Sequence, residues 1–418
     1  MENIKSKADY CLECINKPCS KGCPLNNDTS GFIKLVKEQK YKEAFELLCK
    51  TTVLQPICGR ICPHTKQCQK KCIRGIKGEP VSIGELEAFI GDLSIKNNWE
   101  IPKNAIGIEK NKKIAVIGGG PAGLTCAAFL AKEGYQVTIY DKHKELGGIL
   151  SHGIPEFRLE REITKSTIQK ILNLGIKTKL GKELGKDYNI ETLEKEYDAI
   201  FLSFGSNISN KMNIDGENLQ GIYGGNELLE NCIHPNYANK NVAIIGGGNV
   251  AMDCARTIKR LGAKTVTVIY RRAEEQMPAE KKEKQEAKSE GIEFLFQTNI
   301  LRILGDEKVE KIECVKTELK QKEGENRLSP VNIQNSNYFM NIDYVVMAVG
   351  SSPDIKLTQS LGVKIDTRGR IETNENNETS SKKIFAGGDL SGETSTVAWA
   401  ARSGRNAAES IIKFLNKD

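Results

Sequence analysis

The sequence has no apolar run that approaches the roughly 20 residues needed to cross a bilayer. Its first residues, Met-Glu-Asn-Ile-Lys-Ser-Lys, lack the apolar core of a signal peptide, so we expect a cytoplasmic protein without a membrane partner. Aromatic residues make up only 6% of the chain, and no basic tract is interleaved with them. The net charge of +7 is spread over many Lys/Glu pairs, so we expect no nucleic-acid partner.

Cysteine is scarce in most of the chain but dense at its beginning. Only four of the 13 cysteines lie in the last 346 residues, and nine lie in the first 72. Disulfides are rare in cytosolic proteins, so closely spaced cysteines there indicate metal or redox chemistry. Eight of the nine form two groups, which read Cys11-x2-Cys14-x4-Cys19-x3-Cys23-Pro24 and Cys58-x3-Cys62-Pro63-x4-Cys68-x3-Cys72.

Iron–sulfur clusters are the favoured occupants of these two groups. Thiolates are the usual ligands of such clusters, and eight positions would serve two [4Fe–4S] clusters. Structural zinc is one alternative, although zinc sites prefer clean cysteine pairs, which these spacings fit poorly. Disulfides are the other alternative. An amphipathic helical segment lies between the two groups, with apolar residues from Phe32 to Leu48, and Cys49 on this segment is expected to be a buried core thiol. A second helical segment is expected over 83–93.

The pattern of the chain changes near residue 112 to alternating strands and helices. A unit of strand, glycine-rich turn, helix and strand begins at residue 114 and recurs at residue 242, which predicts two dinucleotide-binding domains. Late strands are expected at 344–349 and 384–386. The simplest arrangement is a sheet that is interrupted by the second domain and resumes near the C-terminus.

The first glycine-rich turn satisfies G-x-G-x-x-G between a strand and a helix. It reads Gly118-Gly119-Gly120-Pro121-Ala122-Gly123. In such a turn Gly118 permits the tight bend, Gly120 lets the backbone approach a pyrophosphate, and Gly123 lets helix and strand pack closely. The helix N-terminus directs amide donors at the phosphates. Asp141 ends the next strand, where a carboxylate binds a ribose diol.

The second turn has alanine in place of the last glycine. It reads Gly246-Gly247-Gly248-Asn249-Val250-Ala251. The following strand ends in Arg271 and Arg272 rather than in an acid. A carboxylate would repel a 2′-phosphate, whereas guanidinium groups bind it in bidentate fashion, so this site is predicted to prefer NADP over NAD. The alternative is that both arginines lie on the surface at a strand end.

Two nucleotide sites in one chain indicate one bound flavin, FAD, and one exchanging nicotinamide, NADPH. Hydride transfer between stacked rings needs alignment rather than a protein acid or base, so we name no catalytic side chain. Disulfide reductases of this layout need a close cysteine pair near the flavin, but Cys126, Cys232, Cys254 and Cys314 are scattered. Electrons are therefore expected to leave, one at a time, through the N-terminal clusters.

The predicted fold class is α/β, with two Rossmann-like dinucleotide-binding domains, one inserted in the other, preceded by an α-helical iron–sulfur domain. We expect residues 1–110 to bind two [4Fe–4S] clusters, residues 111–231 and 349–418 to bind FAD, and residues 232–348 to bind NADPH. A highly charged, helical stretch over 274–290 is expected to be solvated surface.

Several further stretches follow a pattern that extends over essentially the whole chain. They are Ile83–Glu87, Gly118–Leu124, Leu146–Gly148, Gly153–Arg158, Gly246–Asp253, Arg271–Arg272, Met277–Ala279, Gly387–Asp389 and Thr396–Ala398. Together with the cysteine groups, they make the chain resemble the small (beta) subunit family of NADPH-dependent glutamate synthase. Its relatives include the N-terminal half of dihydropyrimidine dehydrogenase, the large subunit of NADH-dependent ferredoxin:NADP oxidoreductase, and sulfide dehydrogenase subunits.

The resemblance implies that the ligands of the two clusters interleave the cysteine groups. One cluster would take Cys11, Cys14, Cys19 and Cys72. The other would take Cys23, Cys62, Cys68 and a side-chain oxygen at Glu87. Cys58 would then lie close to a cluster without binding it. Because iron in clusters normally prefers sulfur, the alternative for Glu87 is a glutamate on a helix surface.

The resemblance also implies further FAD-binding positions. They are Gly147, Gly148 and Arg158, then Gly388 and Asp389 near the ribityl–phosphate portion, and the backbone amides of Thr396 and Val397 near the reduced isoalloxazine ring. The alternative for this C-terminal turn is ordinary packing of a strand on a helix.

The function implied by the resemblance is that of an NADPH-dependent oxidoreductase that feeds glutamate biosynthesis. Electrons would pass from NADPH through FAD and the clusters to a large catalytic subunit or a ferredoxin-like acceptor. Alternatives with the same cofactors are the large subunit of a ferredoxin:NADP oxidoreductase, which is a bifurcating transhydrogenase, and a sulfide dehydrogenase. The alternative from a different class is a zinc-binding regulatory protein with an inert dinucleotide fold.

Overall fold

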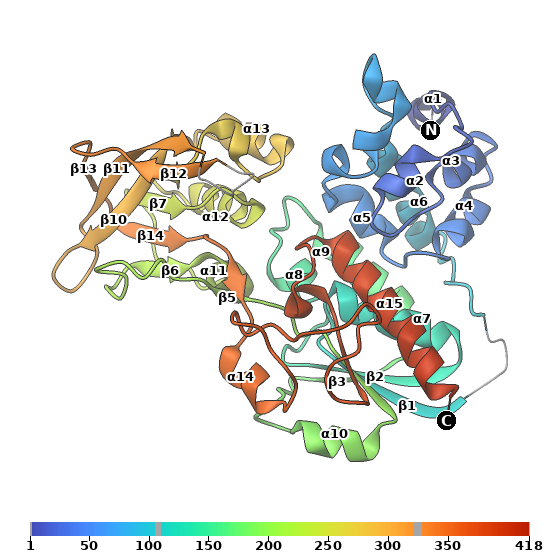
Figure 1. The fold of residues 1–418 in the computed structure, drawn as a ribbon. Coiled ribbons are helices and arrows are strands. Elements are labelled where there is room, and N and C mark those ends of the chain that lie inside the picture. The colour runs from blue at the N-terminus through green and yellow to red at the C-terminus, as the bar shows by residue number, and fades with distance from the viewer. Residues whose placement is uncertain (1, 105–109, 322–327, 418) are drawn as a thin grey trace. The chain divides into compact units, whose positions relative to one another are not determined.

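The computed structural model describes residues 2–104, 110–321 and 328–417 (Figure 1). The chain divides into two compact units, the first made of Met1–Ser206 with Pro353–Asp418 and the second of Asn207–Ser352. The first unit contains the N-terminal helices and one parallel sheet, and the second contains another parallel sheet, a four-stranded antiparallel sheet and a two-stranded antiparallel one. Within the described ranges, no helix is long and apolar enough to cross a membrane.

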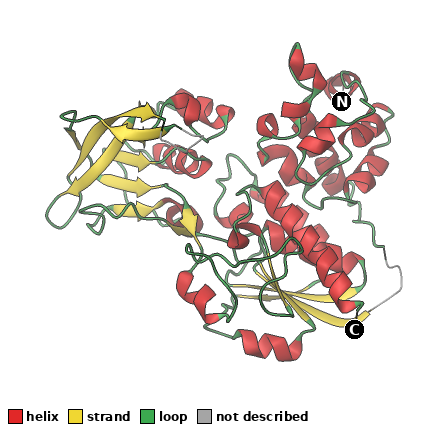
Figure 2. Ribbon diagram, in the orientation of Figure 1, coloured by secondary structure: helices red, strands yellow, loops and turns green. Residues whose placement is uncertain are grey.

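Residues 2–104 form helices and loops without a strand (Figure 2). The elements are α1 (Glu2–Asp9), α2 (Pro18–Gly22), α3 (Thr29–Lys37), α4 (Tyr41–Leu48), α5 (Gln55–Ile61), the 3-10 turns η1 (His64–Lys66), η2 (Gln69–Lys71) and η3 (Ile73–Ile76), and α6 (Ile83–Lys96). Two glycines let α5 and α6 pack closely, since a Cβ on Gly59 would lie 2.3 Å from the nitrogen of Ala88 and one on Gly91 would lie 2.5 Å from that of Pro56.

The amphipathic segment over 32–48 is two helices rather than one. α3 ends at Lys37 and α4 begins at Tyr41, and Gln39 between them has a φ of 57°, in the left-handed region. Asp28 caps α3 by accepting a backbone N–H at 3.0 Å. The break turns the chain so that both helices place their apolar faces in one core.

The sheet of the first unit is parallel throughout and has the order β16-β4-β1-β2-β3. Its strands are β1 (Lys110–Ile117), β2 (Tyr135–Asp141), β3 (Lys177–Leu180), β4 (Ala199–Leu202) and β16 (Ile384–Ala386), and its helices are α7 (Pro121–Lys132), α8 (Ile149–His152), α9 (Arg161–Leu172), α10 (Ile190–Glu196), α14 (Ile355–Ser360), η5 (Gly388–Ser391) and α15 (Val397–Leu415). Because β16 pairs with β4, the chain returns to this sheet after the second unit, which confirms that one domain is inserted in the other.

The second unit is built on a parallel sheet of order β6-β14-β7-β8-β9. Its elements are β5 (Ile208–Ser209), β6 (Ile222–Gly224), α11 (Gly225–Asn231), β7 (Asn241–Ile245), α12 (Asn249–Arg260), β8 (Thr265–Tyr270), η4 (Glu274–Gln276), α13 (Lys281–Ser289), β9 (Glu293–Phe296), β10 (Thr298–Leu304), β11 (Lys311–Lys320), β12 (Ser329–Asn332), β13 (Tyr338–Asn341), β14 (Tyr344–Met347) and β15 (Ser351–Ser352). Residues 207–231 lie in this unit rather than with the first sheet, because β6 pairs with β14. β5 and β15 pair antiparallel where the chain enters and leaves.

The charged stretch over 274–290 is not wholly solvated, so that expectation is wrong in part. Arg256 on α12 is only 3% exposed. Its guanidinium group pairs with Glu283 at 2.7 Å and with Glu290 at 2.9 Å. A buried cation is tolerated only when carboxylates compensate its lost hydration, and here Glu283 of α13 and Glu290, directly after that helix, supply them.

α7 and α15 cross at a point that has no room for a side chain. A Cβ on Gly404 would lie 2.1 Å from the carbonyl oxygen of Ala122. Ala122 is in the first turn of α7, so this contact holds the start of α7 against the C-terminal helix. The glycine is therefore required by the approach of two backbones rather than by its own φ.

We expect Gly404→Ala to destabilise the protein by about 1–3 kcal/mol, because the added methyl group must push the two helices apart. Thermal unfolding of the purified full chain measures the effect. Lys413→Ala changes an exposed position on the same helix and should leave the melting temperature close to that of the unmodified protein. An unaltered melting temperature in Gly404→Ala would contradict the close crossing.

Candidate functional site

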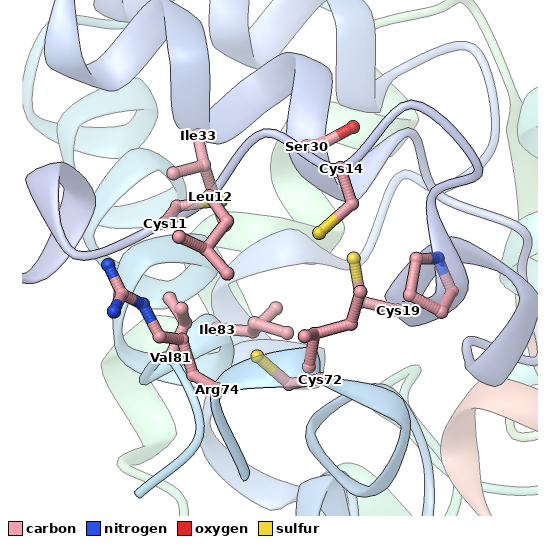
Figure 3. A pocket seen from close by; sticks show the side chains of 12 residues that line it. Cys11, Leu12, Cys14, Cys19, Ser30, Ile33, Cys72, Arg74, Val81 and Ile83 are labelled. Atoms are coloured by element: carbon pink, nitrogen blue, oxygen red, sulfur yellow. The ribbon is translucent and has the colours of Figure 1, made fainter. Parts of the chain in front are cut away.

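One cavity in the N-terminal helical part is lined by four cysteines. They are Cys11, Cys14, Cys19 and Cys72. Figure 3 shows the sulfur atoms of Cys14, Cys19 and Cys72 pointing into the same space. Burial raises the pKa of the Cys11 and Cys19 thiols. Four thiols around an apolar space are the donor set of a [4Fe–4S] cluster, and iron would favour their deprotonated form.

The second set of predicted ligands is more deeply buried. Burial, followed by the nearby charge of Glu87, raises the pKa of Cys23 to about 12 and that of Cys68 well above its usual range. A hydrogen bond with Cys58, followed by burial, raises the pKa of Cys62. The structure therefore brings these three cysteines and Glu87 together, and Cys58 lies next to them through its hydrogen bond with Cys62.

Glu87 does not lie on a helix surface. Its side chain is 5% exposed, and burial raises its pKa to about 8. The Asn27 Nδ2 donates to the Glu87 Oε1 at 3.2 Å, and the Thr51 hydroxyl donates to the Asn27 Oδ1 at 2.7 Å. Hydrogen bonds of this kind orient ligating carboxylates in metal sites. Asn27 and Thr51 belong to no motif, so the sequence gives no signal that would identify them.

Disulfides, a single metal ion and an iron–sulfur cluster require different arrangements of these thiols. All 13 cysteines are free thiols, which argues against the disulfide alternative. Across 2–104, 110–321 and 328–417, no three Cys, His, Asp or Glu side chains converge where a single ion could sit. The first cysteine set surrounds a space instead, and thiolate donors are those that iron–sulfur clusters use.

The first glycine-rich turn lies between β1 and α7. Gly118 has a φ of 100°, which glycine adopts without strain, and a Cβ on Gly123 would lie 1.9 Å from the Gly118 carbonyl oxygen. Asp141, at the end of β2, accepts the N–H of Gly119 at 2.7 Å and that of His143 at 2.8 Å. The carboxylate thus lies beside the turn, where a ribose-binding acid belongs.

Glycines from two other segments lie against this turn. Gly147 donates its N–H to the turn at 2.8 Å, and a Cβ on Gly148 would lie 3.0 Å from the Gly120 Cα. A Cβ on Gly388 would lie 3.1 Å from the Cβ of Ala122. Because the three glycines carry no side chain, the backbones of all three segments can approach a dinucleotide closely.

The remaining predicted FAD contacts belong to the same unit. Asp389 lies in η5, directly after β16, and burial raises its pKa to about 6. The Thr396 hydroxyl caps α15 by accepting a backbone N–H at 3.4 Å, and Val397 is the first residue of that helix. Arg158 lies in the turn that precedes α9. The 19 residues of α15 direct a positive helix dipole toward Thr396.

The second glycine-rich turn joins β7 to α12. Gly246 has a φ of 138°, and a Cβ there would lie 2.1 Å from the carbonyl oxygen of Ala348. A Cβ on Gly248 would meet nothing within 4 Å, so the start of α12 is open to a ligand. The Asn249 Oδ1 accepts the Glu280 N–H at 3.0 Å and ties the turn to the segment that precedes α13. The turn therefore has a bend without room for a side chain and an open helix start.

Arg271 and Arg272 directly follow β8. The side chain of Arg271 is exposed, and the Arg272 Nε is buried without a hydrogen-bond partner among the described residues. Thr317 donates to the Arg271 carbonyl oxygen at 2.8 Å, and Gln297 donates to that of Arg272 at 3.0 Å, so the strand end is held in place. A buried donor without a partner costs free energy until an acceptor is supplied, and an anion such as a 2′-phosphate would supply one.

The chain matches two protein families in succession. Residues 1–99 match the family described as Dihydropyrimidine dehydrogenase domain II, 4Fe-4S cluster. Residues 112–404 match the family described as Pyridine nucleotide-disulphide oxidoreductase. The two matches correspond to the cysteine-rich helices and to the part with the two glycine-rich turns.

Several curated proteins are similar over nearly the whole chain. Glutamate synthase [NADPH] small chain from Escherichia coli K12 is 35% identical over 98% of this chain and 91% of its own length. The small chain from Azospirillum brasilense is 30% identical over 99% of this chain and 89% of its own length. NADP(+)-dependent formate dehydrogenase subunit beta from Moorella thermoacetica is 34% identical over 96% of this chain, which spans 60% of that protein.

Solved structures share the fold of the two sheets at low sequence identity. Mycobacterium tuberculosis FprA in complex with NADPH has a TM-score of 0.67 and 18% identity, and covers 74% of this chain and 85% of its own. Thioredoxin reductase from T. acidophilum has a TM-score of 0.57 and 22% identity, and covers 73% of this chain and 99% of its own. These likenesses establish the fold alone.

Gly123 and Ala251 occupy the same position in the two turns and offer a matched pair of substitutions. Gly123→Ala should destabilise the protein by about 1–3 kcal/mol and lower its FAD content, because the Cβ would lie 1.9 Å from the Gly118 carbonyl oxygen. Ala251→Gly removes one buried methyl group and should cost about 1 kcal/mol without loss of FAD. Flavin absorbance per chain and thermal unfolding measure both. A full FAD content in Gly123→Ala would contradict the assignment of FAD to the first turn.

Proposed function

We propose a function from the premise that this chain belongs to the family of NADPH-dependent glutamate synthase small chains and related iron–sulfur flavoproteins. In that function, the chain passes electrons from NADPH through FAD to two [4Fe–4S] clusters and on to a partner subunit. The chain is an NADPH-dependent oxidoreductase that joins a FAD/NADP fold to a 4Fe–4S domain. The observation that carries the cluster step is the cavity lined by four cysteines, in the same compact unit as the first dinucleotide turn.

NADPH is assigned to the second unit. The open turn at Gly248 and the start of α12 present backbone N–H groups and a positive dipole to the pyrophosphate. Arg271 and Arg272 stand where an NAD-binding fold carries an acid, so they would bind the 2′-phosphate and select NADPH over NADH. The buried, unpartnered Nε of Arg272 supports this assignment.

FAD is assigned to the first unit, where it would divide the two electrons of a hydride into single electrons. The turn Gly118–Gly123 would receive the pyrophosphate at the start of α7, and Asp141 would accept hydrogen bonds from the ribose. Gly388–Asp389 would lie along the ribityl–phosphate portion. The amides of Thr396 and Val397, at the positive end of α15, would stabilise negative charge on the reduced ring.

Two [4Fe–4S] clusters are assigned to the two sets of buried side chains. The ligands of the first are Cys11, Cys14, Cys19 and Cys72, and those of the second are Cys23, Cys62, Cys68 and Glu87. A carboxyl group and three thiols that are buried together cannot all ionise without compensating positive charge, which iron would supply. Cys58, which is hydrogen-bonded to Cys62, would remain a neighbour rather than a ligand.

A separate subunit is proposed as the electron acceptor. The relatives are named small chains and beta subunits, which implies that each works with a further subunit. By analogy with the small chains that cover nearly all of this sequence, the favoured partner is a large subunit that makes glutamate. A ferredoxin:NADP oxidoreductase or a sulfide dehydrogenase would use the same cofactors, and the identity of the subunit that co-purifies separates these cases.

Cys14→Ser should lower the iron content by about half, since one of two clusters would lose a ligand. Iron, acid-labile sulfide and FAD are measured per chain after anaerobic purification. Cys232→Ser, which changes an exposed cysteine of the second unit, should retain all three. Full iron in Cys14→Ser would refute the ligand assignment, and loss of FAD along with iron would mean that the helical part and the first sheet fold together.

Replacement of both Arg271 and Arg272 by alanine should lower kcat/KM for NADPH about 10–100-fold and change that for NADH little. The reason is the loss of charge-assisted hydrogen bonds worth about 1.5–3 kcal/mol. Lys264→Ala removes an exposed cation just before β8, at the opposite end of the strand, and should not alter the preference. Equal losses of kcat/KM for NADPH and NADH would show that the arginines do not bind the 2′-phosphate.

A further inference from the structure

A buried arginine on α15 joins that helix to the cysteine-rich part of the first unit. Arg405 is 9% exposed. Its Nη1 donates to the carbonyl oxygens of Leu25 and Thr51, both at 2.9 Å, and Leu25 lies 380 positions away in the sequence. The crossing of α15 with α7 is made by Gly404, so Arg405 serves the contact with the cysteine-rich part rather than that crossing.

Both partners of Arg405 lead to the second set of predicted cluster ligands. Leu25 follows Cys23 by two positions. The hydroxyl of Thr51 donates to Asn27 at 2.7 Å, and the amide of Asn27 in turn donates to Glu87 at 3.2 Å. A continuous chain of bonds therefore runs from α15 to the carboxyl group that is proposed as a ligand.

The charge of Arg405 is poorly compensated on its own side. Burial lowers its pKa, whereas the charges of Glu409 and Cys23 raise it. The carboxylate of Glu409 lies 3.8 Å from the Arg405 Nε, but it is 58% exposed, so solvent screens it. A guanidinium group stays protonated in proteins, so a fixed positive charge remains beside Cys23.

The helix itself links this cation to the proposed flavin site. Arg405 lies eight residues after Val397, which corresponds to about 12 Å along an α-helix. The first turn of α15 would face the reduced flavin, and its third turn contacts the segment that follows Cys23. The second set of ligands, rather than the first, is thus attached to the flavin-binding helix.

We propose that Arg405 is a positioning residue that attaches the second [4Fe–4S] cluster to the flavin-binding helix and raises the reduction potential of that cluster. The inference rests on the proposed cluster ligands. A cluster gains one negative charge on reduction, and a fixed cation in a low-dielectric interior stabilises the reduced form. The second cluster would consequently be the one that accepts electrons from FAD.

The chain supplies a matched control at the same contact. Lys132, on α7, is also buried and also donates to a carbonyl oxygen of the helical part, that of Cys49, at 2.7 Å. The charges that act on it are those of Cys49 and Glu133, and no predicted cluster ligand is among them. Removal of this cation therefore tests the contact without the electrostatic effect.

The experiment is a redox titration, followed by electron paramagnetic resonance, of the full chain purified anaerobically. Arg405→Gln should shift the midpoint potential of one cluster to more negative values and leave that of the other in place. Arg405→Lys, which keeps the charge, should restore most of the shift. Lys132→Gln should leave both midpoints unchanged.

Unchanged midpoints in Arg405→Gln, or equal shifts in Arg405→Gln and Lys132→Gln, would overturn the proposal. If Arg405→Gln loses iron while Lys132→Gln keeps it, the positioning role is supported; iron loss from both would overturn it. Clusters absent from the unmodified protein would instead refute the proposed function, so the two failures are distinguishable.

Discussion

The burial of several cysteine thiols beside one carboxyl group is the constraint on which the first unit depends. Burial raises the pKa of Glu87 to about 8, and burial together with the charge of Glu87 raises that of Cys23 to about 12, so these groups cannot all hold their charges at neutral pH without compensation. A group that supplies positive charge would convert this cost into binding energy, which couples the folding of the helical part to its cofactor. The close packing of α5 on α6 serves the same end, because it brings Cys62 next to Glu87.

The two glycine-rich turns solve one problem with different tolerances. In the first, helix and strand approach so closely that Gly123 has no room for a methyl group, and α15 crosses the same helix start at Gly404. In the second, Ala251 fits within the core. The third glycine is unobstructed in both turns, since a Cβ on Gly248 would meet nothing within 4 Å and one on Gly120 would meet only the Gly148 Cα at 4.0 Å. The turns therefore differ at their last position, where helix and strand pack, and not at the glycine that faces the pyrophosphate.

The sequence predicted the features whose causes are local. Apolar runs beside glycine turns identified β1, β2, β7 and β8, and the cysteine spacing identified residues that the fold brings together. It did not predict the burial of Glu283 under Arg256 or the antiparallel strands β10–β13, because each depends on partners distant in sequence. The roles of Asn27 and Arg405 were not predicted for the same reason. Their partners lie up to 380 positions away, so no single segment of the sequence contains a pattern that would identify them. The break at Gln39, which was also not predicted, is local, held by the Lys40 N–H donating to the Leu35 carbonyl oxygen at 2.9 Å, but its left-handed residue is a glutamine where glycine is usual.

The division into units matches the different needs of the two electron-transfer steps. Single-electron transfer between fixed cofactors needs a constant separation, and the proposed flavin and cluster sites lie in one compact unit. Three cations support that arrangement: the buried Arg405 and Lys132 and the half-buried Lys170 each donate to backbone carbonyl groups of the helical part. Hydride transfer instead needs a nicotinamide that arrives and departs, and its proposed site is in the other unit, which the chain enters and leaves through β5 and β15. Of these three cations, Arg405 is the one whose charge acts on a predicted cluster ligand, Cys23. The same side chain would therefore both attach the cluster-binding part to α15 and raise the reduction potential of the second cluster.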